Sequence, residues 1–151
     1  MCGIVGYTGN ENAVEILIEA LAGLEYRGYD STGISVFVDD DILTIKSVGR
    51  LARLQNRIEK IHPGLSSACG IGHTRWATHG KPSDINAHPH VTEKVSMIHN
   101  GIIENYQSLR KFLYEKGYEF SSETDTEVAV KMIDFLYDGD PVRTLFKAQK
   151  E

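Results

Sequence analysis

The chain has 151 residues, of which 41% are hydrophobic and 25% are charged, and its formal net charge is −5. This length and apolar content suit one soluble globular domain or part of one, and an acidic chain without a basic block offers no electrostatic footprint for nucleic acid or an anionic membrane. No apolar run approaches the roughly 20 residues that span a bilayer, and the N-terminus lacks the features of a signal peptide, so we expect a cytoplasmic protein.

The first part of the chain alternates strands with helices. The predicted elements are a strand over residues 3–7, a helix over 13–24, a hairpin of 33–38 and 42–48, and a helix over 51–61. The strands are apolar runs bounded by turn residues, and the helices repeat apolar residues every three or four positions. Three aspartates at 39–41 favour the hairpin turn, and His62-Pro63-Gly64 ends the second helix.

The second part contains a long loop. A predicted strand over 68–72 runs into residues 74–91, which have little periodicity. Loops of this length are usually functional or disordered, and the Arg, Trp and His content of this one favours function. The remaining predicted elements are a strand over 95–98 and helices over 106–116, 124–137 and from Pro141 onward, with Gly117 as a C-cap. This mixture, without repeats or linkers, predicts a single α+β unit.

The two cysteines differ in their expected roles, although both are expected to be reduced. Cys69 lies in a small apolar strand and is predicted to be a buried, inert thiol. Cys2 would become the first residue on removal of Met1, which places its thiol beside a free α-amine with a pKa of roughly 7.7 to 8.0. Such an amine can act as general base for the thiol, although Met-Cys-Gly alone is also an ordinary chain start. Gly3 is expected to permit close approach of the substrate.

Further residues could serve an acyl-transfer site. Asn100-Gly101 suits either a tight turn or an oxyanion hole formed by the Asn amide and a backbone N–H. Arg75 could grip an α-carboxylate and Asp125 could pair with an α-ammonium, although a single charge is more often a surface charge. Asp125 is equally suited to cap a helix. Trp76 could be a hinged lid or a packing anchor.

Histidines at positions 73, 79, 88, 90 and 99 raise the question of a metal site, because imidazole is a common zinc ligand. The sequence has neither paired Cys motifs nor a His-Glu-x-x-His helix, so we predict no metal. Loop histidines that are hydrogen-bonded to backbone are the simpler interpretation.

Six segments form a recognisable set: CGIVG (2–6), LEYRGYDS (24–31), HTRWATHG (73–80), NAHPH (86–90), HNGIIEN (99–105) and SETDTEV (122–128). Together they resemble class II glutamine amidotransferases of the N-terminal nucleophile hydrolase superfamily, in particular the members that aminate fructose 6-phosphate. The resemblance implies a four-layer αββα sandwich of antiparallel sheets. In that family the glutaminase domain continues past residue 151. We therefore expect residues 1–151 to be its N-terminal portion, incomplete at the C-terminus and without the sugar isomerase domains.

The resemblance also implies a site and a reaction. By this resemblance, the nucleophile is Cys2, and the oxyanion hole is formed by Asn100 and Gly101. The α-carboxylate and α-amino groups of glutamine are bound by Arg75 and Asp125. The site is also lined by Trp76, Thr78, His79 and His88, and an orienting loop contains Arg27 and Gly28. The thiolate attacks the carboxamide, ammonia departs, and a γ-glutamyl thioester is hydrolysed to glutamate. Neither a metal nor an organic cofactor is required.

The expected partners are glutamine and, through domains outside this chain, fructose 6-phosphate, which becomes glucosamine 6-phosphate in a homo-oligomeric enzyme. A second hypothesis gives the ammonia to another acceptor, as in amidophosphoribosyltransferases or asparagine synthetases, which differ from this chain in the 24–31 and 73–80 segments. A third hypothesis is an inactive fragment, because the fold is incomplete or because Met1 is retained.

Overall fold

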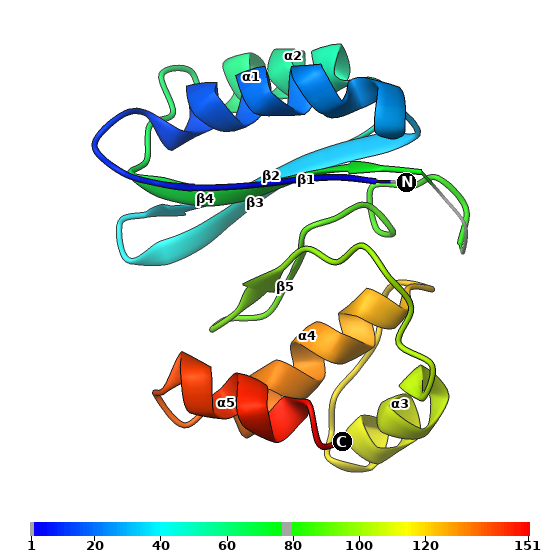
Figure 1. The fold of residues 1–151 in the computed structure, drawn as a ribbon. Helices are drawn as coiled ribbons and strands as arrows, with labels where there is room; N and C mark the ends of the chain where they lie inside the picture. Colours follow the sequence, from blue (N-terminus) through cyan, green and yellow to red (C-terminus); the bar gives the residue numbers. More distant parts are fainter. Residues whose placement is uncertain (1, 77–79) are drawn as a thin grey trace.

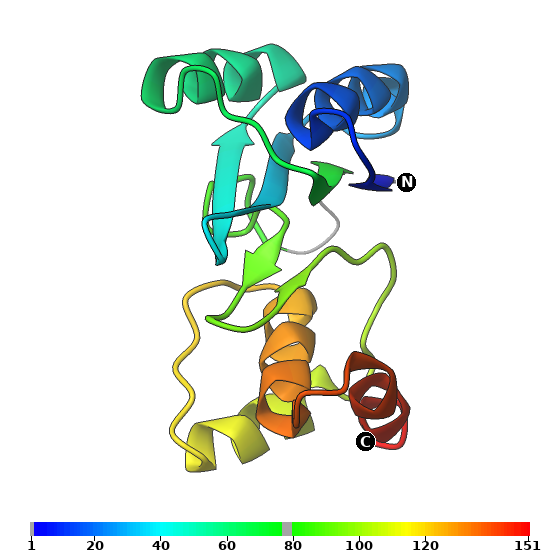
Figure 2. The same cartoon turned by 90° about the vertical axis from the view of Figure 1, so that its left-hand side faces the viewer.

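The computed structural model describes residues 2–76 and 80–151, and its elements lie in four layers (Figure 1). The helices are α1 (Ala13–Leu24), α2 (Leu51–Ile61), α3 (Tyr106–Glu115), α4 (Asp125–Leu136) and α5 (Pro141–Ala148), with a 3-10 helix, η1 (Glu25–Arg27). The strands are β1 (Gly3–Thr8), β2 (Ser31–Val38), β3 (Asp41–Val48), β4 (Cys69–Arg75), β5 (His90–Val91) and β6 (Ser96–Met97). Helices α1 and α2 cover one side of the sheets, and α3, α4 and α5 lie on the other side (Figure 2).

The larger sheet has the strand order β1-β4-β2-β3, and all of its neighbouring strands are antiparallel. The predicted hairpin is confirmed as β2 and β3, which pair from Ser31↔Val48 to Val38↔Asp41. Its two turn residues, Asp39 and Asp40, have positive φ angles of 51° and 63°. Short polar side chains tolerate this left-handed conformation, and such turns match the twist of a hairpin.

Two apolar clusters form the core of the described structure. The first lies between α1, α2 and the larger sheet, and its buried residues are Val14, Leu17, Leu21, Ile34, Val36, Ile45, Leu51, Leu54 and Ile58. The second joins α3 to α4 through Leu113, Val128 and Met132. Burial of each such side chain stabilises the fold by about 1.5–3 kcal/mol. Because the helices place their apolar residues on one buried face, the helical spacing of these residues predicts the helices correctly.

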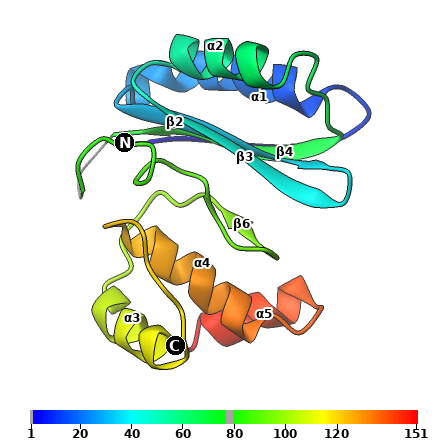
Figure 3. The same cartoon turned by 180° about the vertical axis from the view of Figure 1, so that it is seen from behind.

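The small sheet of β5 and β6 lies between the larger sheet and α4 (Figure 3). Its contact with the larger sheet includes polar groups, since Ser96 Oγ donates to Ser35 Oγ at 2.8 Å and Ser35 Oγ shares a 2.6 Å hydrogen bond with Thr44 Oγ1. Buried hydroxyl groups need hydrogen-bond partners. These three hydroxyls supply partners to one another where the two sheets meet.

Several predicted elements differ from the observed ones. The strand expected over 95–98 is reduced to Ser96–Met97, and the loop expected from residue 74 begins only after Arg75 because β4 pairs to that point with β2. Cys69 is a free thiol, as expected, but it is partly exposed at the start of β4 and not buried. Among the helices of the described residues, none combines the length and apolar character needed to cross a membrane.

Candidate active site

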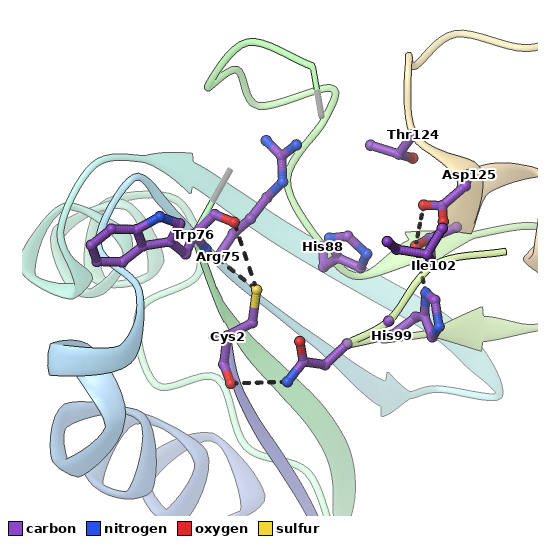
Figure 4. Close-up of a pocket in the computed structure, with 11 residues that line it drawn as sticks. Cys2, Arg75, Trp76, His88, His99, Ile102, Thr124 and Asp125 are labelled. Carbon is purple, nitrogen blue, oxygen red and sulfur yellow. Dashed lines mark hydrogen bonds between the residues drawn. The ribbon is translucent and has the colours of Figure 1, made fainter. Parts of the chain in front are cut away.

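A pocket of about 310 Å³ gathers residues from the start of β1, the end of β4, the segment 99–102 and the start of α4 (Figure 4). The predicted residues that line it are Cys2, Arg75, Trp76, His88, Asn100, Gly101 and Asp125. Thr78 and His79, which were also predicted, lie outside the described residues. Groups more than 100 positions apart in the sequence therefore meet in one cavity.

Cys2 immediately precedes β1, and the pairing of β1 with β4 fixes its position. Trp76 N–H donates to Cys2 Sγ at 3.4 Å, and Sγ lies 3.9 Å from Trp76 O. Gly3 N–H donates to Thr74 Oγ1 at 3.1 Å. A Cβ at Gly3 would lie 2.6 Å from Thr74 Oγ1 and 2.7 Å from Leu24 Cβ. Glycine at this position permits the close approach of Thr74 and Leu24, and the expected approach of the substrate stays a prediction.

Trp76 is 47% exposed, and its ring packs edge-on against Tyr29 with the ring centroids 5.4 Å apart. In Figure 4 the indole lies on the far side of Cys2 from Asp125. The backbone of Trp76 therefore contacts the thiol, while its ring stands at the edge of the pocket.

Asn100 reaches the cysteine directly, because its Nδ2 donates to Cys2 O at 3.3 Å. The interpretation of Asn100-Gly101 as a tight hairpin turn is wrong, since neither residue has the positive φ of that turn and residues 98–105 form no strand. Asn100 and Gly101 both line the pocket, and the Asn100 amide has a second N–H besides the one that it gives to Cys2 O. Donors of this kind are what an oxyanion requires.

Asp125 is the first residue of α4. Its Oδ2 accepts a hydrogen bond from Ile103 N–H at 2.8 Å. The capping role considered for Asp125 belongs instead to Thr124, whose Oγ1 accepts from Glu127 N–H at 3.3 Å. The carboxylate of Asp125 is therefore available to the pocket.

Arg75 ends β4 and is only 5% exposed. Its Nη2 donates to Gly80 O at 3.4 Å. Arg75 and Asp125 give the pocket one cationic and one anionic group, which is the arrangement that a zwitterionic α-amino acid needs.

Gly28 lies against the backbone of Arg75, and Arg27 directly precedes it in the sequence. Arg27 ends η1, and a Cβ at Gly28 would lie 2.6 Å from the carbonyl carbon of Arg75. Asp30 N–H then donates to Arg75 O at 3.2 Å. This loop packs on the backbone of the residue that carries the guanidinium, so its geometry favours an orienting function.

Three buried histidines form a column beside the pocket. The rings of His73 and His88 stack with their centroids 4.3 Å apart, and His90 meets His88 edge-on at 4.9 Å. Burial lowers the pKa of His73 to about 4 and that of His90 to about 3. Burial, followed by the neighbouring His73, holds the pKa of His88 far below its ordinary range. At neutral pH all three imidazoles are uncharged.

The simple interpretation of these histidines as backbone-bonded loop residues is only partly correct. His90 Nε2 shares a 2.8 Å hydrogen bond with the side chain of Thr124, and neither ring nitrogen of His88 has a hydrogen-bond partner within residues 2–76 and 80–151. In the same residues, no group of three His, Cys, Asp or Glu side chains is placed to hold a metal ion.

Unfolding of this protein should become easier as the pH falls from about 6.5 towards 4. In the unfolded chain these imidazoles bind protons near the ordinary pKa of 6.5, whereas the folded pKa is about 4 for His73 and about 3 for His90. Unfolding therefore takes up protons in this window, and stability declines by roughly 1 kcal/mol per pH unit for each histidine. Urea unfolding at pH 7, 6 and 5 measures the slope. His90→Gln should flatten it, and an unchanged slope in that variant would contradict the assignment.

The start of α4 is anchored by Glu127, which is 4% exposed. Its carboxylate accepts from Ser122 N–H at 2.6 Å and from Ser121 N–H at 2.9 Å, and it pairs with Lys131 Nζ at 2.6 Å. Burial alone would raise the pKa of Glu127, but the Lys131 and serine donors outweigh it and lower the pKa to about 2. The first turn of α4 is thus a fixed platform at the pocket.

The sequence predicts no specific role for four other lining residues, which are His99, Ile102, Thr124 and Thr126. It marks His99 only as one of five histidines. Thr124 and Thr126 flank Asp125, and this adjacency at a predicted helix start is the signal that could have found them.

Comparison with known proteins gives a consistent picture. A family profile described as a glutamine amidotransferase domain matches residues 62–138. The glutamine–fructose-6-phosphate aminotransferase [isomerizing] of Clostridium perfringens is 54% identical over 152 residues, covering 99% of this chain and 25% of that protein. The enzyme of the same name from Thermus thermophilus is 49% identical, with 99% and 25% coverage. The chain therefore spans about a quarter of the length of these relatives.

Solved structures share the fold at low sequence identity. The glutamine phosphoribosylpyrophosphate amidotransferase of B. subtilis, complexed with ADP and GMP, has a TM-score of 0.81 at 23% identity, covering 99% of this chain and 32% of that one. A structure described as the allosteric regulatory enzyme of purine biosynthesis has a TM-score of 0.82 at 21% identity, covering 99% and 33%. The predicted α+β sandwich of antiparallel sheets is confirmed.

Proposed function

The chain belongs to the family of glutamine amidotransferase domains, and we propose that residues 1–151 form the N-terminal portion of a glutaminase domain that uses Cys2 as its nucleophile. The observation that carries this proposal is the meeting of Cys2, Asn100, Arg75 and Asp125 in one pocket of about 310 Å³. Nucleophile, amide donor, cation and anion are the groups that glutamine hydrolysis requires.

Substrate recognition is proposed to rest on charge. The α-carboxylate of glutamine would pair with the guanidinium of Arg75, and the α-ammonium with Asp125, whose carboxylate is held by Ile103 N–H at 2.8 Å. His88 adds no charge, because burial keeps its imidazole neutral. The pocket then offers one group of each sign, and the side chain of the substrate can extend towards Cys2. Trp76, Thr78 and His79 remain predicted contacts.

The proposed chemistry begins after Met1 is removed. The freed α-amine of Cys2 accepts the thiol proton, and the thiolate attacks the carboxamide carbon of glutamine. The tetrahedral oxyanion accepts hydrogen bonds from Asn100 Nδ2 and Gly101 N–H, each worth on the order of 3 kcal/mol. Collapse of the intermediate breaks the C–N bond, and the α-ammonium returns a proton to the departing ammonia. Water then hydrolyses the γ-glutamyl thioester to glutamate and regenerates the thiol.

We further propose that, in the full-length protein, the ammonia aminates fructose 6-phosphate to give glucosamine 6-phosphate. The support is the 49–54% identity to enzymes named for that reaction, compared with 21–23% identity to the two solved amidotransferase-fold structures described above. The acceptor site and the expected homo-oligomer would depend on parts of the protein outside this chain. Amination of a phosphoribosyl donor in place of fructose 6-phosphate would overturn this assignment.

The proposed nucleophile can be tested by trapping. Intact mass should show that Met1 is absent, and treatment with the glutamine-like electrophile 6-diazo-5-oxonorleucine should add one adduct that maps to Cys2 and abolishes glutamate production. The second free thiol, Cys69, is the internal control, because it is partly exposed but lies outside the pocket. The Cys69→Ser variant should label as the unaltered protein does.

Labelling at Cys69, or no adduct on protein that lacks Met1, would refute the nucleophile assignment. If Met1 is retained, it is removed enzymatically and the labelling is repeated. This distinguishes inactivity caused by a retained Met1 from inactivity caused by a wrong nucleophile assignment.

A further inference from the structure

The two proposed oxyanion donors lie on a segment that is held from both ends. Asn100 and Gly101 belong to no helix or strand. On one side of them, His99 Nδ1 shares a 3.2 Å hydrogen bond with Thr126 Oγ1, and on the other side Ile103 N–H donates to Asp125 Oδ2 at 2.8 Å. Both anchors lead to the first turn of α4.

The direction of these hydrogen bonds follows from Asp125. The Thr126 hydroxyl donates to Asp125 Oδ1 at 3.4 Å, because a carboxylate can only accept. Thr126 Oγ1 is then free to accept from His99 Nδ1–H, which fixes the tautomer of the ring. Thr126 is only 1% exposed, so water does not replace either interaction. Asp125, Thr126 and His99 therefore form a continuous polar chain.

The far side of the His99 ring lies beside Gly101. A Cβ at Gly101 would lie 2.7 Å from His99 Nε2, closer than real carbon atoms approach. The absence of a side chain at Gly101 thus leaves room for the His99 ring beside this backbone. His99 therefore lies between Thr126 and the peptide that carries this donor.

We propose that His99 and Thr126 are positioning residues that couple substrate recognition to oxyanion stabilisation, an inference that rests on the proposed glutaminase function. The carboxylate that receives the α-ammonium of glutamine also holds both ends of the segment that carries Asn100 and Gly101. One helix start therefore sets both the distance from the substrate amine to the thiol and the direction of the oxyanion donors. A donor misplaced by about 1 Å loses much of its effect on the transition state.

The coupling is tested with matched substitutions at Thr126 in the full-length protein. Valine keeps the shape of threonine without a hydrogen-bonding group, whereas serine keeps the hydroxyl. Thr126→Val should lower kcat for glutamine hydrolysis by roughly 10- to 100-fold, with a smaller change in KM, because the oxyanion donors lose their alignment. Thr126→Ser should restore most of the activity. Inhibition by glutamate, which needs no oxyanion donors, should change less than kcat.

A second pair of variants tests the same chain from His99. His99→Asn retains a donor close to the Nδ1 position and should remain more active than His99→Leu. If both residues act through one hydrogen bond, the double variant Thr126→Val/His99→Leu should be little worse than the more impaired single variant. Thermal unfolding of each variant shows whether it folds, and the His99 pair carries the test if Thr126→Val does not fold.

The outcomes separate this inference from the proposed function. If the unaltered full-length protein has no Cys2-dependent glutaminase activity, both the proposed function and the proposed coupling are wrong. An active starting protein whose Thr126→Val variant has the same kcat would overturn only the coupling, as would a Thr126→Ser variant as impaired as Thr126→Val. Additive losses in the double variant would also overturn it.

Discussion

Replacing Cys2 with alanine should reduce glutamine hydrolysis by about 10⁴-fold or more, because no other group in the pocket can form the thioester. The thiol is the atom to which Trp76 N–H donates at 3.4 Å, and Asn100 Nδ2 reaches the carbonyl of the same residue at 3.3 Å. Glutamate formation measures the loss. If the full-length protein aminates fructose 6-phosphate as we propose, that reaction should continue with added ammonia, since it does not use the thiol.

The matched control for this loss is the other thiol. Cys69→Ala should retain glutamine hydrolysis, because Cys69 lies outside the active-site pocket. Unchanged glutamine hydrolysis in Cys2→Ala would show that Cys2 is not the nucleophile. Loss of both the glutamine and the ammonia reactions would mean that the substitution damages the fold and not the chemistry.

Replacing Asn100 with alanine should have the second largest effect, a fall in kcat of roughly 10²- to 10³-fold, which corresponds to the loss of one oxyanion donor. The amide is aimed at the nucleophile residue, and it has no role in a hairpin turn. KM for glutamine should change much less, because Arg75 and Asp125 would still bind the ground state. Steady-state kinetics on purified protein gives both constants.

Asn105→Ala is the control for Asn100, since Asn105 is exposed near the same segment and its Nδ2 contacts Glu151 O, away from the pocket. Its kcat should stay near that of the unaltered protein. A result in which Asn100→Ala raises KM and leaves kcat intact would reassign Asn100 to substrate binding.

Periodicity predicts the helices and long strands of this fold well, because they bury regular apolar faces. α1, α2 and the β2–β3 hairpin were expected within a few residues of their observed bounds. The two-residue strands β5 and β6 were not predictable to the same precision. Their backbone pairing depends on lying between the larger sheet and α4, which is a tertiary effect that leaves no period in the sequence.

The site, like the fold, has features that the sequence pattern predicts and features that depend on tertiary contacts. Spacing cannot show that Cys2 and Asn100 lie together, and their joint assignment depended on resemblance. The pairing of β1 with β4 brings Cys2 to Trp76, and the Asn100 amide then reaches the same residue. Which residue caps α4 was equally open, because Ser, Thr and Asp at the helix start all accept hydrogen bonds and only the backbone geometry selects Thr124.

The histidine column was missed for a physical reason. His73 lies in β4, and His88 and His90 lie more than ten positions later, after a loop. Their stacking depends on how that loop returns across the sheet. Each residue alone resembles an ordinary polar side chain, and only their common burial makes them neutral.

The location of Trp76 has an optical consequence. It is the only tryptophan in these 151 residues, and its backbone N–H contacts the thiol of Cys2. Indole emission from this segment therefore comes from a single position at the edge of the pocket, where the ring is 47% exposed and packs against Tyr29. Fluorescence of the isolated segment reports the state of one site and not an average over the fold, so it can follow occupancy of the pocket without an added dye.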